Sequence, residues 1–219
     1  MRVWLARVRL SLVLLTERRL ALFAVIDGFF LFAGFSIALL GSGSATDFWL
    51  PMFLLPALFV AVPILADAVA VERRSGTLDL ALTSPGADRY FERRAIAVAA
   101  LLVAQGWLGV LLARLIGEPF PLSGPFAQVI VTAIFLAAAV LYWAVRLETT
   151  GAAMFATYAT AAVFAKWLFS NPIHPPTTLQ PMELGDYIDY AQQNLVLSLA
   201  AAVFYLYTRQ RLARPERLL

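Results

Sequence analysis

Cysteine is absent from this 219-residue chain, and histidine occurs once, as His174. Without cysteine there is no disulfide framework, no thiolate zinc site and no cysteine nucleophile, and one histidine cannot form a two-histidine metal motif. Charge is scarce too, because 14% of the residues are charged and 61% are hydrophobic, with a mean hydropathy of +0.78. A soluble domain of this length needs a charged surface that so few charged residues cannot supply. The composition therefore predicts an integral membrane protein.

Motifs for catalysis are missing as well. The sequence contains no Gly-x-Ser-x-Gly elbow, no His-Glu-x-x-His and no phosphate-binding loop. We therefore expect no enzyme active site, no metal and no cofactor bound by this chain. The net charge of +3 could suggest nucleic acid, but the distribution of the charges favours membrane topology instead, so no nucleic-acid partner is expected.

Long apolar runs dominate what is present. Five or six of them reach about 20 residues, enough to cross a hydrocarbon core of about 30 Å as a helix. A closed barrel would alternate apolar and polar residues, and these runs do not. We expect an all-α integral membrane protein with a single transmembrane domain, residues 1–219. The predicted spans cover 20–40, 49–71, 95–116, 126–145, 150–169 and 192–208.

The segments outside these spans are short. Residues 1–19 mix five arginines with apolar residues, which predicts an interfacial helix on the inner leaflet, although a basic flank that only fixes orientation is the alternative. Residues 171–191 form the longest polar interval. Its Leu184, Tyr187 and Ile188 share a helical face, so this outer loop is expected to hold a short helix or to be a plain capping loop.

The basic residues are distributed unevenly along the chain. If the N-terminus is cytoplasmic, 15 of the 17 lysines and arginines lie in inner segments, and the predicted outer loops hold none. Cytoplasmic loops of membrane proteins carry such an excess of positive charge. The sequence therefore predicts six spans with both chain ends in the cytoplasm.

A polar stretch lies on the predicted cytoplasmic side between the second and third spans. It runs from Glu72 to Pro85 and contains Arg73, Gly76, Thr77, Leu78, Asp79 and Leu82. Ser75 or Thr77 can cap a short helix over 75–84 in which Leu78, Ala81 and Leu82 share one face, and Pro85 ends it. An apolar face of two turns must lie on the membrane or fit a groove on a partner. The residues alone leave both possibilities open.

This stretch resembles the signature of type-2 exporter permeases of ABC transporters, in which Glu-Arg or Glu-Lys precedes Gly-Thr-Leu, an acidic residue, leucines and Thr-Pro or Ser-Pro. The resemblance extends to the layout of an in-plane N-terminal helix and six spans. It departs at Ala81, where leucine is usual, and at Arg93-Arg94, where a single lysine often opens the third span. The resemblance implies that 75–84 is the coupling helix that docks on an ATPase subunit.

The resemblance implies a multi-pass subunit of the bacterial cell (inner) membrane. ATP and Mg²⁺ would bind a partner nucleotide-binding subunit, and a second permease copy or a homologue would complete the transporter among membrane lipids. The exported substrate could be a lipid, a glycan, a drug or a peptide. Two alternatives stay open, which are the haem-exporter permease of cytochrome c maturation and a membrane scaffold or enzyme outside the ABC class.

Four charged residues fall inside the predicted spans. Asp27 lies about two turns into the first span, so it either lines a translocation path or pairs with an arginine of another helix. Asp67 is expected to be structural. Two others are expected to be anchors at the membrane boundary. Arg114 is close enough in sequence to Glu118 for an i, i+4 contact, and Lys166 can snorkel outward. The fifth span repeats Ala152, Ala156 and Thr160 at i, i+4, and the third span offers Gly106, Gly109 and Ala113. These small residues predict close helix packing, within the subunit by default or at a dimer interface.

Overall fold

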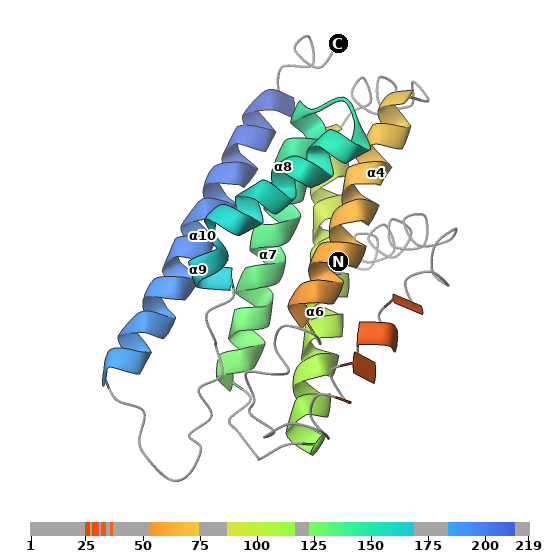
Figure 1. The fold of residues 1–219 in the computed structure, drawn as a ribbon. Helices are drawn as coiled ribbons and strands as arrows, with labels where there is room; N and C mark the ends of the chain where they lie inside the picture. Colours follow the sequence, from red (N-terminus) through yellow and green to blue (C-terminus); the bar gives the residue numbers. More distant parts are fainter. Residues whose placement is uncertain are drawn as a thin grey trace, which may run out of the picture.

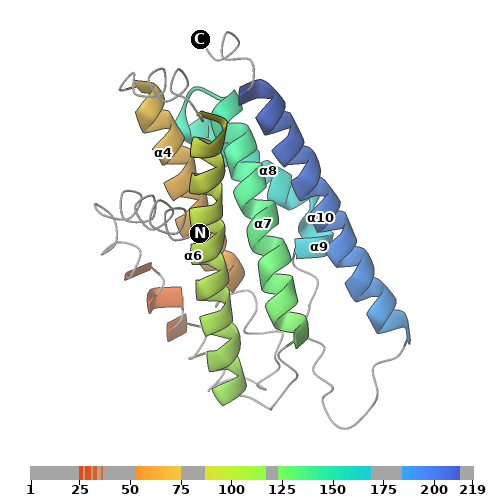
Figure 2. The same cartoon turned by 180° about the vertical axis from the view of Figure 1, so that it is seen from behind.

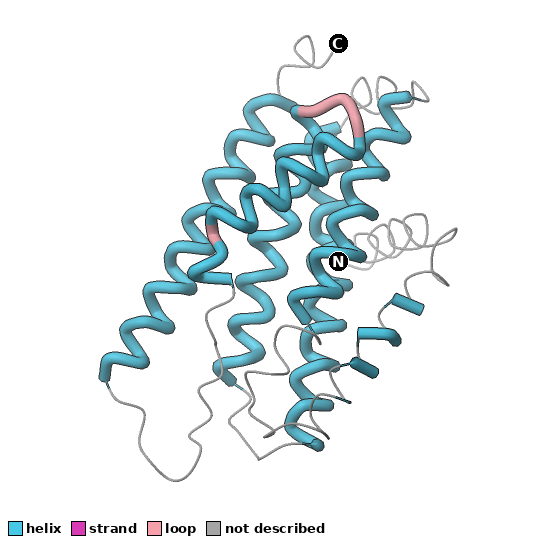
Figure 3. Tube along the Cα trace, in the orientation of Figure 1, coloured by secondary structure: helices cyan, strands magenta, loops and turns pink. Residues whose placement is uncertain are grey.

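The computed structural model describes residues 53–74, 87–116, 123–168 and 184–212, together with eight positions between 25 and 36. All these residues are helical except at 147–149 and 164, and no strand occurs among them (Figure 3). The expectation of an all-helical chain is thus confirmed for the described residues. The predicted interfacial helix 1–19, the coupling helix 75–84 and residues 171–183 of the outer loop lie outside them.

Four of the described helices run along the bundle. They are α4 (Val62–Arg74), α6 (Ala87–Ile116), α7 (Ser123–Arg146) and α10 (Leu184–Leu212), while α8 (Thr150–Val163) crosses them obliquely and α9 (Ala165–Leu168) is a short turn of helix (Figure 1). Helix α7 packs against α4, α6, α8 and α10, so it forms the centre of the bundle, and the view from behind shows α6 on its other side (Figure 2).

The central position of α7 follows from its sequence. Apolar side chains occur around its whole circumference, and two thirds of an 18-residue apolar window within Pro125–Arg146 is buried inside the protein. A helix that is hydrophobic on all sides belongs in a core. Phe135 is fully buried and lies with its ring centroid 5.0 Å from that of Phe164 and 6.1 Å from that of Phe204. These aromatic contacts join α7 to the chain after α8 and to α10.

Helices α6 and α7 approach closely at Gly106. A Cβ atom built on this glycine would lie 2.6 Å from Phe53 Cδ2 and 2.6 Å from Val129 Cγ1. Only a residue without a side chain fits between these neighbours. The expected close packing of the third span at Gly106 is therefore observed, and its partners are α7 and the start of the preceding helical segment.

Directly before α4 the chain forms a π-helix, η2 (Ala57–Ala61), which lies between Pro56 and Pro63. The Val62 N–H bonds to the Ala57 carbonyl, five residues back, as π-helical geometry requires. The next residue, Pro63, has no N–H to offer the Leu58 carbonyl. The Tyr158 hydroxyl of α8 donates to that carbonyl instead, at 3.2 Å. A side chain from another helix thus satisfies the backbone oxygen that proline leaves open.

Three helix boundaries differ from the predicted spans. Helix α6 begins at Ala87, before the expected start at 95. The predicted fifth span is broken at Phe164, whose φ of −90° and ψ of 12° end α8 while its ring packs on Phe135. Residues 184–191, expected as part of a separate outer segment, are the first two turns of α10, and the Asn194 Nδ2 donates to the Tyr190 carbonyl at 2.9 Å across the expected boundary.

Two described helices are long and apolar enough to cross a membrane, namely Glu92–Leu112 and Pro125–Arg146, each with a mean hydropathy of 2.2. The apolar stretch Ala57–Val71 is shorter. Helix α8 has only 14 residues before the break at Phe164, and α10 carries Gln192, Gln193 and Asn194 within its apolar part. The described positions before residue 37 add helical residues beside η2 and α4, where Phe30 stacks on Phe59 of η2 with centroids 6.1 Å apart and Ile26 packs against Ile64 of α4.

Candidate functional site

Several helix ends gather at one end of the bundle. The C-terminal ends of α4, α7 and α10 and the N-terminal end of α6 lie together, at the top of Figure 1. These helix ends contain Arg73, Arg74, Arg89, Arg93, Arg94, Arg146, Arg209 and Arg211. Arginines in the last turns of α7 and α10 also favour the helix, because a helix C-terminus carries partial negative charge. We call this the arginine-bearing end.

The predicted coupling residues fall at this end in part. Glu72 and Arg73 lie in the last turn of α4, whereas Gly76, Thr77, Leu78, Asp79, Leu82 and Pro85 lie outside the described residues. The chain leaves α4 at Arg74 and enters α6 at Ala87. The two helix ends that flank the predicted coupling segment, which we call its α4 anchor and its α6 anchor, therefore both lie at the arginine-bearing end.

The α4 anchor is held by α8. Asp67, less than two turns before the end of α4, accepts a hydrogen bond from the Thr150 hydroxyl, with 3.3 Å between Oγ1 and Oδ1. The neighbouring Thr149 caps α8 by accepting the Ala152 N–H at 3.3 Å. Val69 and Ala70 are buried between these helices and α7. The contact gives Asp67 a structural partner, as expected.

The α6 anchor is held by α10. The Tyr205 hydroxyl donates to the Glu92 carboxylate, with 2.5 Å between the oxygens. Sequence reasoning did not single out this pair, because 113 residues separate the two partners and no local pattern links them. The contact is visible only once α6 and α10 lie on adjacent sides of α7.

The α7 end forms a third polar cluster. The Arg146 guanidinium lies 5.5 Å from the centroid of the Tyr142 ring and donates from Nη1 to the Tyr142 hydroxyl. The Tyr142 ring lies 5.2 Å from that of Phe204 on α10. Cationic groups over aromatic faces are attracted by the ring quadrupole. Side-chain contacts thus link α4 to α8, and link both α6 and α7 to α10.

The other charged residues of the predicted spans have different settings. Asp27 lies outside the described residues, so its two interpretations stay predictions. Arg114 and Lys166 have exposed side chains, as anchors at a membrane boundary require. The expected partner of Arg114, Glu118, lies outside the described residues.

The small-residue face of α8 is displaced from the predicted one. The buried residues are Ala153, Thr157 and Ala161, one position after the predicted stripe of Ala152, Ala156 and Thr160. Ala152 is exposed, whereas Thr160 still contacts α7 by accepting the Trp143 Nε1–H at 2.8 Å. Both stripes have the same spacing and composition, so the sequence could not distinguish them.

The described part of the chain brings no three His, Asp or Glu side chains together as a metal site would need. What it does bring together are the helix ends on either side of Glu72–Pro85, each linked to a neighbouring helix by a side-chain hydrogen bond. The chain matches no protein-family model, no curated protein and no solved structure.

Proposed function

We propose that this chain is the membrane-spanning permease subunit of an ATP-driven ABC exporter. It would couple ATP hydrolysis on a separate nucleotide-binding subunit to export of a lipid, glycan, drug or peptide. The carrying observation is the stretch Glu72–Pro85, with its permease signature, between two helices whose ends are braced at the arginine-bearing end. A segment that receives force needs such fixed attachments on both sides.

The surface of the described helices supports a membrane location. Large apolar side chains are exposed along α6, α8 and α10, among them Leu115 (81% exposed), Phe155 (75%) and Leu195 (59%). Proteins that are surrounded by water rarely expose contiguous apolar surface on this scale, whereas lipid covers it without cost. Together with the positive-inside pattern, this surface supports a multi-pass protein of the bacterial inner membrane with the arginine-bearing end in the cytoplasm.

The packing supports a mechanical role. Helix α4 contacts α7 and α8, and α6 contacts α7, so a push on the coupling segment would reach the bundle through two helices at once. Packed helices transmit such a push as rigid-body motion, because their interfaces are bistable rather than continuously deformable. Two such bundles, either two copies or this chain and a homologue, would then alternate between inward and outward access.

The test uses two matched leucine variants. In a helix over 75–84, Leu78 lies on the apolar face and Leu80 on the opposite one. We expect Leu78→Asp to uncouple ATP hydrolysis from transport and to reduce recovery of the ATPase encoded in a neighbouring reading frame. Leu80→Asp should leave both unchanged.

The measurements are affinity purification of the complex and ATP-dependent transport in proteoliposomes. Purification of the unaltered chain without any ATP-binding subunit would refute the proposal. Full coupling in Leu78→Asp would refute the role of the coupling face and leave the permease assignment standing.

A further inference from the structure

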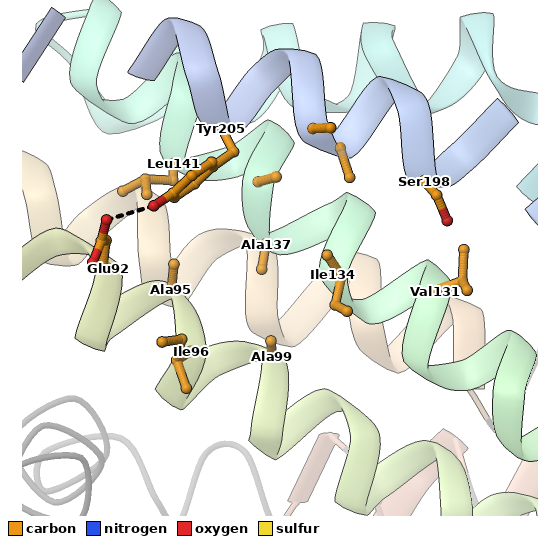
Figure 4. A pocket seen from close by; sticks show the side chains of 13 residues that line it. Glu92, Ala95, Ile96, Ala99, Val131, Ile134, Ala137, Leu141, Ser198 and Tyr205 are labelled. Atoms are coloured by element: carbon orange, nitrogen blue, oxygen red, sulfur yellow. Dashed lines mark hydrogen bonds between the residues drawn. The ribbon is translucent and has the colours of Figure 1, made fainter. Parts of the chain in front are cut away.

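A groove runs along α7 between α6 and α10, whose direct contact with each other is small compared with their contact with α7 (Figure 4). Its volume is about 580 Å³. Six of its 13 lining residues are alanines, and the lining includes the partly exposed Ile96 and Ile134. The space is open because most of the side chains that α6, α7 and α10 turn toward it are small.

The two ends of the groove differ in polarity. At one end the Tyr205 hydroxyl and the Glu92 carboxylate are hydrogen-bonded across the gap, and at the other lie Val131 and Ser198 (Figure 4). One helical turn beyond Tyr205, on the same face of α10, Arg209 is exposed at the arginine-bearing end. An apolar groove therefore leads up to a cation at one end.

The length of the groove restricts its occupant. Its lining residues on α7 run from Val131 to Leu141, a rise of about 15 Å in a helix. This is about half of a hydrocarbon core of about 30 Å, which is close to the reach of one acyl chain. A partner helix would cross the whole core and is about 10 Å wide, which neither the length nor the volume of the groove matches. One acyl chain has the matching length and polarity.

We propose that the groove holds one acyl chain of an inner-leaflet phospholipid, with the lipid phosphate paired to Arg209. This inference rests on one part of the proposed function, namely that the chain lies in a membrane with its arginine-bearing end in the cytoplasm. Arginine binds phosphate oxygens in a bidentate geometry, and the alkyl chain replaces water or void against the alanine walls. The lipid belongs to the surrounding bilayer, and it fills the space that α6 and α10 leave over α7.

The test is photolabelling of the full chain in membranes that contain a phosphatidylglycerol with a diazirine near the end of one acyl chain. Labelled peptides are mapped by mass spectrometry. Because the lipid phosphate lies at the Arg209 end, we expect label at the far end of the groove, around Val131, Ile134 and Ser198. Ala99→Phe, which fills the groove, should reduce this label about tenfold, the change expected when two methylene groups lose their contacts.

The matched control is Ala100→Phe, which adds the same ring to the next residue of α6, an exposed position that does not line the groove. Its label should equal that of the unaltered chain. In a second arm, Arg209→Gln should weaken labelling by phosphatidylglycerol but not by a diacylglycerol that carries the same diazirine. Equal label in Ala99→Phe and Ala100→Phe, or crosslinks mainly to a second copy of the chain, would overturn the proposal.

The assay contains no ATPase, so its outcome is independent of coupling. A chain that stays in the membrane pellet after an alkaline wash but shows no label in the groove overturns the lipid site alone. A chain that the alkaline wash releases overturns both the lipid site and the proposed function.

Discussion

Pro63 removes one hydrogen-bond donor from the helix that leads into the predicted coupling segment, and Tyr158 supplies a replacement from α8. An unpaired carbonyl in an apolar interior costs free energy because nothing solvates it. The contact therefore ties α8 to the π-helical part of the chain before α4. Prolines were visible in the sequence as a source of distortion, but the partner of the freed carbonyl depends on tertiary packing.

Replacing Tyr158 by phenylalanine removes this donor while keeping the ring. We expect Tyr158→Phe to destabilise the protein by about 1 kcal/mol, measured by the midpoint of unfolding in a denaturing detergent. Tyr207→Phe, at an exposed position, serves as the control and should change the midpoint little.

A second variant tests the cause. Pro63→Ala restores a backbone N–H, so Tyr158→Phe should cost less in that background than in the unaltered chain. The coupling between the two substitutions should be at least about 0.5 kcal/mol. Additive effects would show that Tyr158 acts through ring packing and not through the Leu58 carbonyl.

At the scale of helices, Gly106 sets the distance between α6 and α7. Gly106→Ala puts a Cβ atom within 2.6 Å of Phe53 and Val129, and we expect overpacking to destabilise the protein by about 1–3 kcal/mol. In Gly151→Ala the new Cβ meets nothing within 4 Å, so removing glycine from a helix should stabilise by up to about 1 kcal/mol. The same unfolding measurement gives the change in stability for each variant. If both variants were stabilised, or both destabilised, the packing explanation would be contradicted.

The sequence predicts the described helices well where apolar runs are long and uninterrupted. The expected spans 95–116 and 126–145 lie within α6 and α7. It does not predict the end of α8 at Phe164, whose ring packs on Phe135 of α7, because no glycine or proline marks this position. It also fails at α10, since no stop signal separates residues 184–191 from the apolar part and the helix simply continues.

The candidate site shows the same division. Glu72 and Arg73 were expected in the polar stretch after the second span, which was expected to end at residue 71, whereas they lie in the last turn of α4. The braces that hold the two anchors, Thr150 on Asp67 and Tyr205 on Glu92, join residues 83 and 113 positions apart. Contacts at such separations carry no local pattern, so only the assembled bundle reveals them.

For the molecule as a whole, the proposed function rests on one end of the bundle. The arginine-bearing end combines helix ends, basic residues and both anchors of Glu72–Pro85. Away from this end, large apolar side chains are exposed along α6, α8 and α10. A soluble ATPase would reach a membrane-embedded chain at such a polar end. The central claim of the proposed function is therefore that the ATPase contacts the coupling segment.

The most direct test is site-specific photocrosslinking with a benzoylphenylalanine at position 78 or at position 80, in cells that also express the neighbouring ATPase. The account predicts a crosslink to the ATP-binding subunit from position 78 and a much weaker one from position 80, because only the apolar face docks. The absence of any crosslink to an ATP-binding protein from both positions would contradict it.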